Sequence, residues 1–305
     1  MSVSKFSIKC LLLTVFIAIV PAGIAQTQDE QTDTSPNRNL TGFEALDEKQ
    51  PLWEVGVGGG VIDVPNYPAS GERNTVALAL PYAIYRGDIF RIGGQGGARA
   101  VFVESQKLEL DISFGGAFAA DSDDNTVREG MPELDYLFEV GPQLIYKIQD
   151  YSFNGGGNAR LNAQLQTRAV FSTDFGHIDA RGYVFEPTLR YQQRGVITPD
   201  TGFSLSARMT WATEKLHDYF YQVTPEFETG FRPAYNAGGG YLGAEVSAGL
   251  AFPVMKNLRG FFGASMQFHH GASNEESPLY EKDVTYSVGV GFVWRGYKSD
   301  AKASW

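Results

Sequence analysis

Hydrophobic and polar residues alternate with a period of two along almost the whole chain from Trp53 onward. The stretch VTYSVGVGFVW, residues 284–294, shows the pattern: Val, Tyr, Phe and Trp occupy one set of alternate positions, and Thr, Ser and Gly occupy most of the other. Successive side chains of a β-strand point to opposite faces. The stretch therefore predicts a strand with one apolar face and one small, mostly polar face.

The alternation predicts twelve strands, most of them longer than the five or six residues typical of globular proteins and long enough to cross a membrane at a tilt. Aromatic residues gather at the ends of the stripes, as at two lipid–water interfaces. The predicted strands are 53–61, 76–84, 90–102, 108–114, 134–148, 161–171, 183–191, 203–211, 219–221, 242–252, 258–268 and 284–294.

We therefore expect an all-β protein, a transmembrane antiparallel up-and-down β-barrel of about twelve strands whose apolar stripes face lipid. Backbone groups in lipid must all be paired, so such a sheet has to close. The last strand, 284–294, is expected to pair with the first strand near Trp53–Val61. A soluble β-sandwich is the alternative, but it would have to bury every apolar stripe.

The strand count also predicts which connections share an end of the barrel. With both chain ends in the periplasm, the outer loops are 63–74, 105–106, 150–156, 195–201, 225–238 and 271–282. The acidic segment 121–132 then becomes an unusually long inner turn. Either that turn is functional, or the count errs near Gly93–Gly97, where a glycine-rich stretch can bend the chain.

The N-terminal residues 1–25 are predicted to be a secretory signal peptide. Lys5 and Lys9 precede the apolar run 11–20, and small residues permit cleavage after Ala25. A retained membrane anchor is the alternative, although the run is short for a spanning helix. Residues 26–50 are expected to be a flexible lead-in, 51–296 the barrel and 297–305 a C-terminal tail.

The net charge and the cysteine content exclude one class of partner and one kind of cross-link. The net charge is −10, and it becomes −12 once Lys5 and Lys9 are removed. No basic face is evident, so nucleic acid is not an expected partner. Cys10 is the single cysteine, which excludes an intrachain disulfide.

Three motifs are considered for chemistry and set aside. His269 and His270, with Glu275 and Glu276, suggest a metal site, but adjacent strand residues point to opposite faces. The acidic residues of 121–125 match a calcium loop incompletely. The glycines of 56–60 are not followed by a helix, as a nucleotide loop requires. We expect no catalytic, cofactor-binding or metal-binding residues, and a barrel hydrolase using one of the four histidines remains a weaker alternative.

Charged residues on the non-lipid face are the candidate site. Their mixed signs predict cross-strand ion pairs that fill the barrel interior. The predicted lumen-lining residues are Arg91, Arg99, Glu139, Arg168, Glu186, Arg190, Arg208, Glu245 and Arg259.

The segment WEVGVGGGVIDVPNYPASGERNTVALALPYAIYRGDIFRIGGQGGARAVF resembles the N-terminal signature of the MipA/OmpV family, the MltA-interacting proteins. The shared features are a glycine-rich first strand, a Pro65/Tyr67 loop, a hairpin around Tyr85–Arg91 and a glycine run at 94–97. GMPELDYLFEVGPQLIY, YFYQVTPEF and PAYNAGGGYLGAEVSAGLAF follow in the expected order. The resemblance covers residues 51–296.

The resemblance implies a non-catalytic barrel in the cell outer membrane, in contact with lipid. It also implies a scaffold role, because the best-known member joins a murein hydrolase, a lytic transglycosylase, to a peptidoglycan synthase. The segment 121–132 is then the candidate contact surface, if it is an inner turn. The alternative function is a porin-like channel for small solutes. The chain continues past Trp294 to Trp305, so the assembly signal lies either at Phe292/Trp294 or at Trp305.

Overall fold

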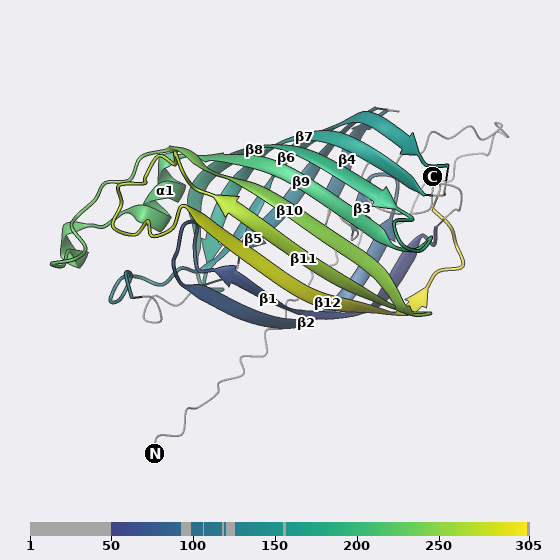
Figure 1. Ribbon diagram of the computed structural model, residues 1–305, viewed down its shortest axis with the longest axis horizontal. Coiled ribbons are helices and arrows are strands. Elements are labelled where there is room, and N and C mark those ends of the chain that lie inside the picture. The colour runs from purple at the N-terminus through teal and green to yellow at the C-terminus, as the bar shows by residue number, and fades with distance from the viewer. Residues whose placement is uncertain are drawn as a thin grey trace, which may run out of the picture. The chain divides into compact units, whose positions relative to one another are not determined.

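The computed structural model describes residues 50–92, 99–105, 107–117, 119, 126–154 and 157–303, all within one compact unit. In this part of the chain, twelve antiparallel strands close into a barrel in which each strand pairs with the next and β12 pairs with β1 (Figure 1). The predicted twelve-stranded barrel is confirmed. The predicted signal peptide and all but the last residue of the predicted lead-in lie outside the described residues. The strands are β1 (Trp53–Pro65), β2 (Arg73–Arg86), β3 (Phe90–Ile92), β4 (Arg99–Glu104), β5 (Leu108–Ala117), β6 (Tyr136–Ser152), β7 (Asn158–Thr173), β8 (Ile178–Arg194), β9 (Gly202–Ala212), β10 (Gly240–Met255), β11 (Leu258–Phe268) and β12 (Val284–Lys298).

The apolar stripes stack on the outer surface of the barrel. Direct cross-strand partners share a face of the sheet, and Val290 of β12 lies between Val61 of β1 and Phe262 of β11. These side chains are exposed, whereas Thr285 on the opposite face of β12 is buried. An apolar exterior of this kind faces lipid in a membrane barrel. The predicted two faces of residues 284–294 and the predicted pairing with the first strand are both confirmed.

The number of strands is right, but two of them differ from the prediction. The predicted strand 90–102 is two strands, because Phe90 of β3 pairs with Ala100 of β4 in antiparallel fashion. The chain therefore reverses direction between β3 and β4, which is the region where the second alternative placed an error in the strand count, although Gly93–Gly97 themselves lie outside the described residues. The predicted strand 219–221 is instead the end of helix α1 (Glu214–Tyr221). The two errors cancel in the total.

Helix α1 forms because its apolar residues recur at helical spacing. Leu216 and Phe220 lie four residues apart and are buried with His217 and Tyr221 on one face. A 3-10 turn, η2 (Pro225–Phe227), follows in the same connection between β9 and β10. No helix in the described residues is long and apolar enough to cross a membrane.

The two ends of the barrel differ in the length of their connections. The end that holds the paired residues Pro51 and Lys302, called here the terminus end, has short connections at 87–89, 105–107, 153–157, 195–201 and 256–257. The other end, called the loop end, has three long ones at 118–135, 213–239 and 269–283, and shorter ones at 66–72 and 174–177. In Figure 1, α1 marks the loop end and the arrowhead of β12 marks the terminus end. Bacterial outer-membrane barrels have short periplasmic turns and longer extracellular loops.

The split between β3 and β4 corrects the expected sidedness. The described part of the acidic segment, 126–132, lies in the β5–β6 connection at the loop end, so the expected inner turn is wrong. The segments 105–106, 150–156 and 195–201, expected outside, belong to the terminus end. The segments 63–74, 225–238 and 271–282 lie at the loop end as expected.

Strand β2 turns its larger side chains inward. Its stripe Val76, Leu78, Leu80, Tyr82 and Ile84 was expected to face lipid, but Ile84 is the direct partner of the buried Glu54 and Leu78 is the direct partner of Gly60. The stripe therefore faces the lumen, and the lipid face of β2 carries Ala77, Ala79, Pro81 and Ala83. Both faces of β2 are apolar in sequence, so alternation alone does not distinguish them.

The chain beyond β12 extends the closing seam. Strand β12 ends at Lys298, beyond the expected barrel boundary at 296. The backbone N–H of Ser299 donates to Trp53, and the N–H of Ala303 donates to the carbonyl of Gln50 at 2.8 Å. The described part of the predicted tail is therefore paired to the residues that precede and begin β1. Trp305 lies outside the described residues.

Candidate functional site

The nine predicted lumen-lining residues occupy inner-face positions on eight strands. Arg91 pairs with Arg99 across β3 and β4, and both guanidinium groups are buried. Arg190 is the direct partner of the buried Asn162, and Arg208 is the direct partner of Glu245. The structure divides them into a central network, a cluster near the terminus end, and two arginines, Arg190 and Arg259, outside both.

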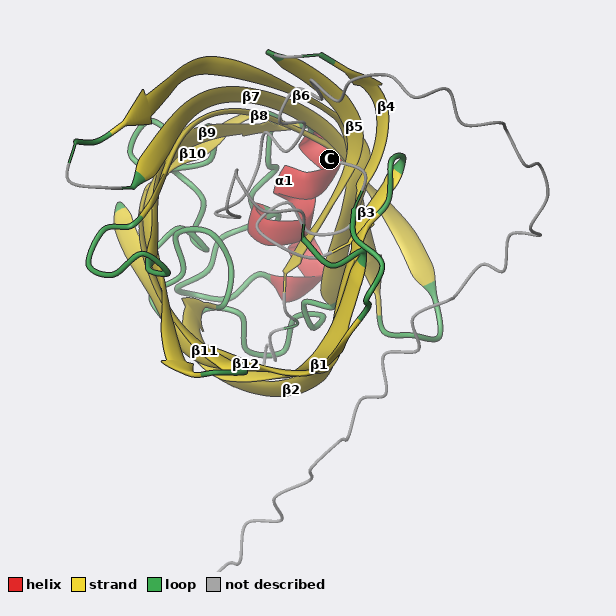
Figure 2. Cartoon of the chain, turned by 90° about the vertical axis from the view of Figure 1, so that its right-hand side faces the viewer, coloured by secondary structure: helices red, strands yellow, loops and turns green. Residues whose placement is uncertain are grey.

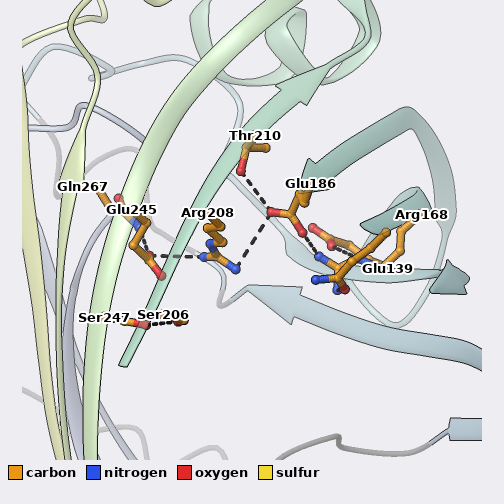
Figure 3. Close-up of polar contacts among 10 residues, drawn as sticks. Glu139, Arg168, Glu186, Ser206, Arg208, Thr210, Glu245, Ser247 and Gln267 are labelled. Carbon is orange, nitrogen blue, oxygen red and sulfur yellow. Dashed lines mark hydrogen bonds and ion pairs between the residues drawn. The ribbon is translucent and has the colours of Figure 1, made fainter. Parts of the chain in front are cut away.

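The central network links five strands, β6 to β10, through alternating acids and bases (Figure 3). Arg168 pairs with Glu139, with Nε to Oε2 at 2.9 Å, and with Glu186. Arg208 pairs with Glu186 at 3.8 Å and with Glu245 at 3.1 Å. Because each arginine lies between two carboxylates, the charges compensate one another inside the barrel, where burying any of them alone is costly.

Neutral side chains complete the hydrogen bonding of this network. Thr210 donates its hydroxyl to Glu186 Oε1 at 3.0 Å, and Gln267 donates its amide to Glu245 Oε2 at 3.0 Å. Thr210 and Gln267 were not among the predicted site residues. Each alternates with the apolar residues of its strand, β9 or β11, and this alternation indicates that it faces inward.

A second ion cluster fills the lumen beside β3, β4 and β5. Glu109 is fully buried and pairs with Arg91 at 3.3 Å and with Arg99 at 3.0 Å. Arg91 also pairs with Glu104 at 2.9 Å. Neither acid was among the predicted site residues, although both alternate with the apolar residues of β4 and β5. The cluster holds the short β3 and β4 strands against β5.

Two predicted arginines have no carboxylate partner in the described part of the chain. Arg259 donates to the backbone carbonyl of Asp200 at 2.8 Å. Arg190 makes no hydrogen bond or ion pair with any described residue, and it is half-buried on the inner face of β8. Arg190 is thus a lumen cation whose guanidinium donors are not used by the neighbouring described residues.

A layer of packed connections covers the lumen at the loop end. We call this layer the loop cap; it consists of the described residues of 66–72, 126–135, 213–239 and 269–283. Leu216, Phe220 and Tyr221 of α1 pack with the inward-facing Val170 and Val184 at the rim of the barrel. Figure 2, a view along the barrel, shows α1 inside the ring of strands.

Buried polar groups join the connections of the loop cap. Arg128 donates to the carbonyl of Phe220 at 3.2 Å, which ties the acidic segment to α1. Asn274 donates to His217 Nδ1 at 2.7 Å and accepts from the N–H of Gly238 at 2.9 Å. His269 Nε2 accepts from the N–H of Ala69 at 3.1 Å. Every long connection of the loop end is therefore bonded to another.

The histidines do not form a catalytic triad in the described structure. His217 and His269 lie in the loop cap, where burial lowers the pKa of each ring. His269 contacts the hydroxyl of Thr285 at 2.9 Å, but its other nitrogen faces the backbone of Leu242 and no carboxylate. His177 and His270 are exposed.

The adjacent His269 and His270 point in different directions, as expected. His270 nevertheless lies close to two carboxylates. His269 is buried, and His270 lies on the surface with Glu275 and Asp283, their ligand atoms within 4.8 Å of one another. Asp283 was not foreseen, because it lies at the far end of the 269–283 connection, just past the expected loop 271–282. Exposed groups of this kind are common without a metal, and we assign no ion to them.

Two adjoining cavities occupy the lumen. The first, about 510 Å³, lies beneath the loop cap and touches Tyr67, Phe220 and the central network. The second, about 670 Å³, touches the inward-facing side chains of β2 and the small residues of β10 to β12. Ile62, Glu245, Ser265 and Ser287 line both cavities, so the two form one continuous chamber.

The fold and the lumen together define an outer-membrane β-barrel, closed by twelve strands and apolar on the outside. The family model described as MltA-interacting protein MipA matches residues 57–296, and the chain belongs to this family. The resemblance seen in the sequence is therefore confirmed, as is localisation in the outer membrane. A search of curated proteins found no match.

Solved structures similar to the chain are outer-membrane barrels. The NanC porin is 8% identical, with 79% of this chain and 98% of that chain covered and a TM-score of 0.35. An outer membrane channel from Pseudomonas putida F1 is 9% identical, with 87% and 100% covered and a TM-score of 0.37. A loop L8 deletion mutant of OmpT, an outer membrane protein of Vibrio cholerae, is 9% identical, with 80% and 100% covered and a TM-score of 0.24.

Proposed function

We propose that this protein is a non-catalytic outer-membrane scaffold that binds peptidoglycan-remodelling enzymes at its terminus end. Family membership supports the role, because the family's description names an interaction with MltA. The loop cap is the structural observation that favours a scaffold over an open pore, since packed side chains lie across the lumen at the loop end.

The terminus end is the side available to a periplasmic enzyme if the barrel has the usual orientation. Two exposed apolar side chains lie there, Ile197 in the 195–201 turn at 75% exposure and Met255 at the end of β10, beside the 256–257 turn, at 71%. The turns are adjacent, since Arg259 at the start of β11 bonds to Asp200 in the 195–201 turn. Exposed apolar residues of this kind are typical of protein contacts.

The test is capture of a purified lytic transglycosylase by the full-length protein in detergent, and separately capture of a peptidoglycan synthase. We expect binding to be lost in the double variant Ile197→Asp/Met255→Asp. The matched control is Phe231→Asp, which places the same charge on a side chain that is 67% exposed at the loop end. If neither enzyme is captured by the unaltered protein, the scaffold role is wrong.

A small-solute channel is the second candidate, and the chamber of two cavities favours it. Single-channel recording in planar bilayers separates the two functions. A scaffold with a covered lumen gives small or absent steps, whereas a porin gives large steps at every voltage.

A further inference from the structure

The larger of the two lumen cavities has an apolar wall. Leu78 and Leu80 of β2 face the lumen and remain 40% and 37% exposed there. Phe261 of β11 lies in the same row of directly opposed residues as Leu78, with the glycines Gly291 and Gly60 between them. Barrel interiors are usually polar, so exposed apolar side chains inside the lumen indicate contact with something apolar.

Glycines leave space beside this apolar wall. Gly263 of β11 and Gly289 of β12 are direct partners, face the lumen and line the larger cavity. A glycine has no side chain to fill the lumen, so the wall is hollow at this point. The volume of the cavity, about 670 Å³, falls in the range of small-molecule sites.

The opposite end of the same cavity is polar and acidic. Among the described residues, Glu245 of β10 is the only charged residue that lines this cavity. The directly opposed serines Ser247, Ser265 and Ser287 also line it, and their row separates Glu245 from the glycines. The cavity therefore joins an apolar end to an end with hydroxyl groups and one negative charge.

One carboxylate oxygen of Glu245 is unused. Arg208 and Gln267 both donate to Oε2, at 3.1 Å and 3.0 Å, and no described residue donates to Oε1 (Figure 3). The side chain keeps 15% of its surface exposed and lines both cavities, so Oε1 is open to the lumen. An ionised carboxylate only accepts hydrogen bonds, so its natural ligand is a donor.

The charges around the chamber favour a donor that is also a cation. The central network contains three carboxylates and two arginines, which gives a net charge of −3 + 2 = −1. Glu245 lies at one end of the network and pairs with one arginine, whereas Glu186 pairs with two. Asp135 adds an acid to the lining of the smaller cavity, and Arg190 and Arg259 line neither cavity.

We infer that the lumen binds a cationic amphiphile, a small molecule with an extended apolar chain and one ammonium group. The chain lies over the glycines against Leu78, Leu80 and Phe261, and the ammonium group donates to Glu245 Oε1 beside the serine hydroxyls. The site lies in the lumen, away from the turns assigned to a partner enzyme, so each proposal can fail without the other.

Equilibrium dialysis of radiolabelled octylamine against the full-length protein in nanodiscs of zwitterionic lipid tests the inference, with empty nanodiscs subtracted. We expect saturable binding to one site at neutral pH, where the amine is an ammonium ion. Butylamine lacks the apolar length and octanoate has the opposite charge, so each is expected to bind much more weakly. Octanoate binding as tightly as octylamine would overturn the inference.

Glu245→Gln tests the acid. The variant removes the charge but keeps an acceptor for Arg208 and Gln267, and it is expected to weaken octylamine binding about tenfold, because a charge-assisted hydrogen bond is lost. Asp150→Asn removes the same charge from a side chain that is 44% exposed near the terminus end, and it is expected to leave binding unchanged. Equal weakening by the two variants would mean that the overall negative charge of the protein attracts the amine, contrary to the inference.

A matched pair of variants tests the hollow itself and remains decisive if Glu245→Gln fails to fold. Gly263→Trp fills the cavity at a position where an added Cβ meets no atom closer than 3.9 Å. Met266→Trp adds the same ring to a lipid-facing residue of the same strand that is 47% exposed. We expect Gly263→Trp to abolish octylamine binding and Met266→Trp to preserve it. Equal binding by these two variants would show that the amine does not occupy the cavity.

Discussion

The imidazole Nε2 of His269 accepts a hydrogen bond from the backbone N–H of Ala69 at 3.1 Å. The bond ties the β11–β12 connection to the β1–β2 connection across the barrel mouth. Since an accepting nitrogen carries no proton, the closed loop cap requires a neutral ring. Burial is the main cause that lowers the pKa of His269 below its ordinary 6.5, and the nearby backbone of Leu242 and the charge of Asp283 act in the opposite direction.

Acid is therefore expected to loosen the loop cap. A detached connection exposes His269 and His217 to water and restores their ordinary pKa, so the open form binds more protons than the closed form. Closure is then fully stable above about pH 6.5 and weakens as the pH falls from there through the lowered pKa. Hydrogen exchange of residues 66–72 and 269–283, corrected for the intrinsic pH effect, is expected to be faster at about pH 5 than at about pH 8.

Two histidine variants separate this effect from general acid sensitivity. His269→Gln keeps an acceptor for Ala69 without a titrating ring, so part of the pH dependence is expected to disappear. His177→Gln removes a histidine that is 89% exposed outside the loop cap and is expected to change nothing. Equal pH dependence in both variants would contradict the role of His269.

Glu186 is the acid on which the central network depends most. It accepts from Arg168 and Thr210 and pairs with Arg208. Glu186→Gln leaves a buried arginine undercompensated, and the expected loss is about 3 kcal/mol in the free energy of unfolding. Urea unfolding in detergent micelles measures it.

Asp150→Asn is the matched control for Glu186→Gln. Asp150 pairs with Arg160 at 2.6 Å but is 44% exposed near the terminus end. An exposed pair contributes less than about 1 kcal/mol. A control loss as large as that of Glu186→Gln would show that the network has no special role.

The chain after Lys298 is expected to stabilise the closing seam. Its residues donate from Ser299 to Trp53 and from Ala303 to Gln50, and Ala301 accepts from the N–H of Leu52. Truncation after Lys298 removes these bonds at the one place where the barrel closes on itself. We expect the truncated protein to assemble but to lose its heat-resistant electrophoretic migration at a lower temperature.

Trp294 provides the comparison for the truncation. It faces lipid on β12 between Val57 and Leu258 and is 49% exposed. Trp294→Ala is expected to slow insertion into liposomes and to leave the melting temperature nearly unchanged. If the truncated protein inserts slowly and Trp294→Ala inserts at the normal rate, the assembly signal lies at residues 299–305.

The sequence predicts the barrel well because lipid imposes a simple rule. Residues 284–294 of β12 follow the alternation, since one face meets lipid and the other meets the lumen. The rule is weaker where both faces of a strand are apolar, as in β2. Either Leu78 or Ala77 could face lipid by sequence, and only the pairing of β2 with the β1 strand that holds Glu54 shows which of them does. It also fails for Tyr219–Tyr221, whose aromatic residues belong to a helix packed inside the mouth.

The candidate site is predictable as a face but not as a set of pairs. Alternation places Arg168, Glu186 and Arg208 on the inner face. It does not say that Arg168 has two acids and Arg190 none, because strand registers across β6 to β10 decide which charges meet. Periodicity does not predict the loop cap either. Its contacts join connections that are far apart in the chain, such as the one between Arg128 and Phe220.

Opening the loop cap is expected to convert a poorly conducting barrel into a channel. Phe220→Asp puts a charge into the apolar core where α1 packs against the rim, and the buried carboxylate cannot be paired there. Single-channel steps are expected to increase several-fold, while the strands and the heat-resistant migration persist. Phe231→Asp is the control, because Phe231 lies in the same connection but is 67% exposed. Large steps in the unaltered protein would contradict the covered lumen, and unchanged small steps in Phe220→Asp would show that the barrier to ions lies in the charged networks of the lumen and not in the loop cap.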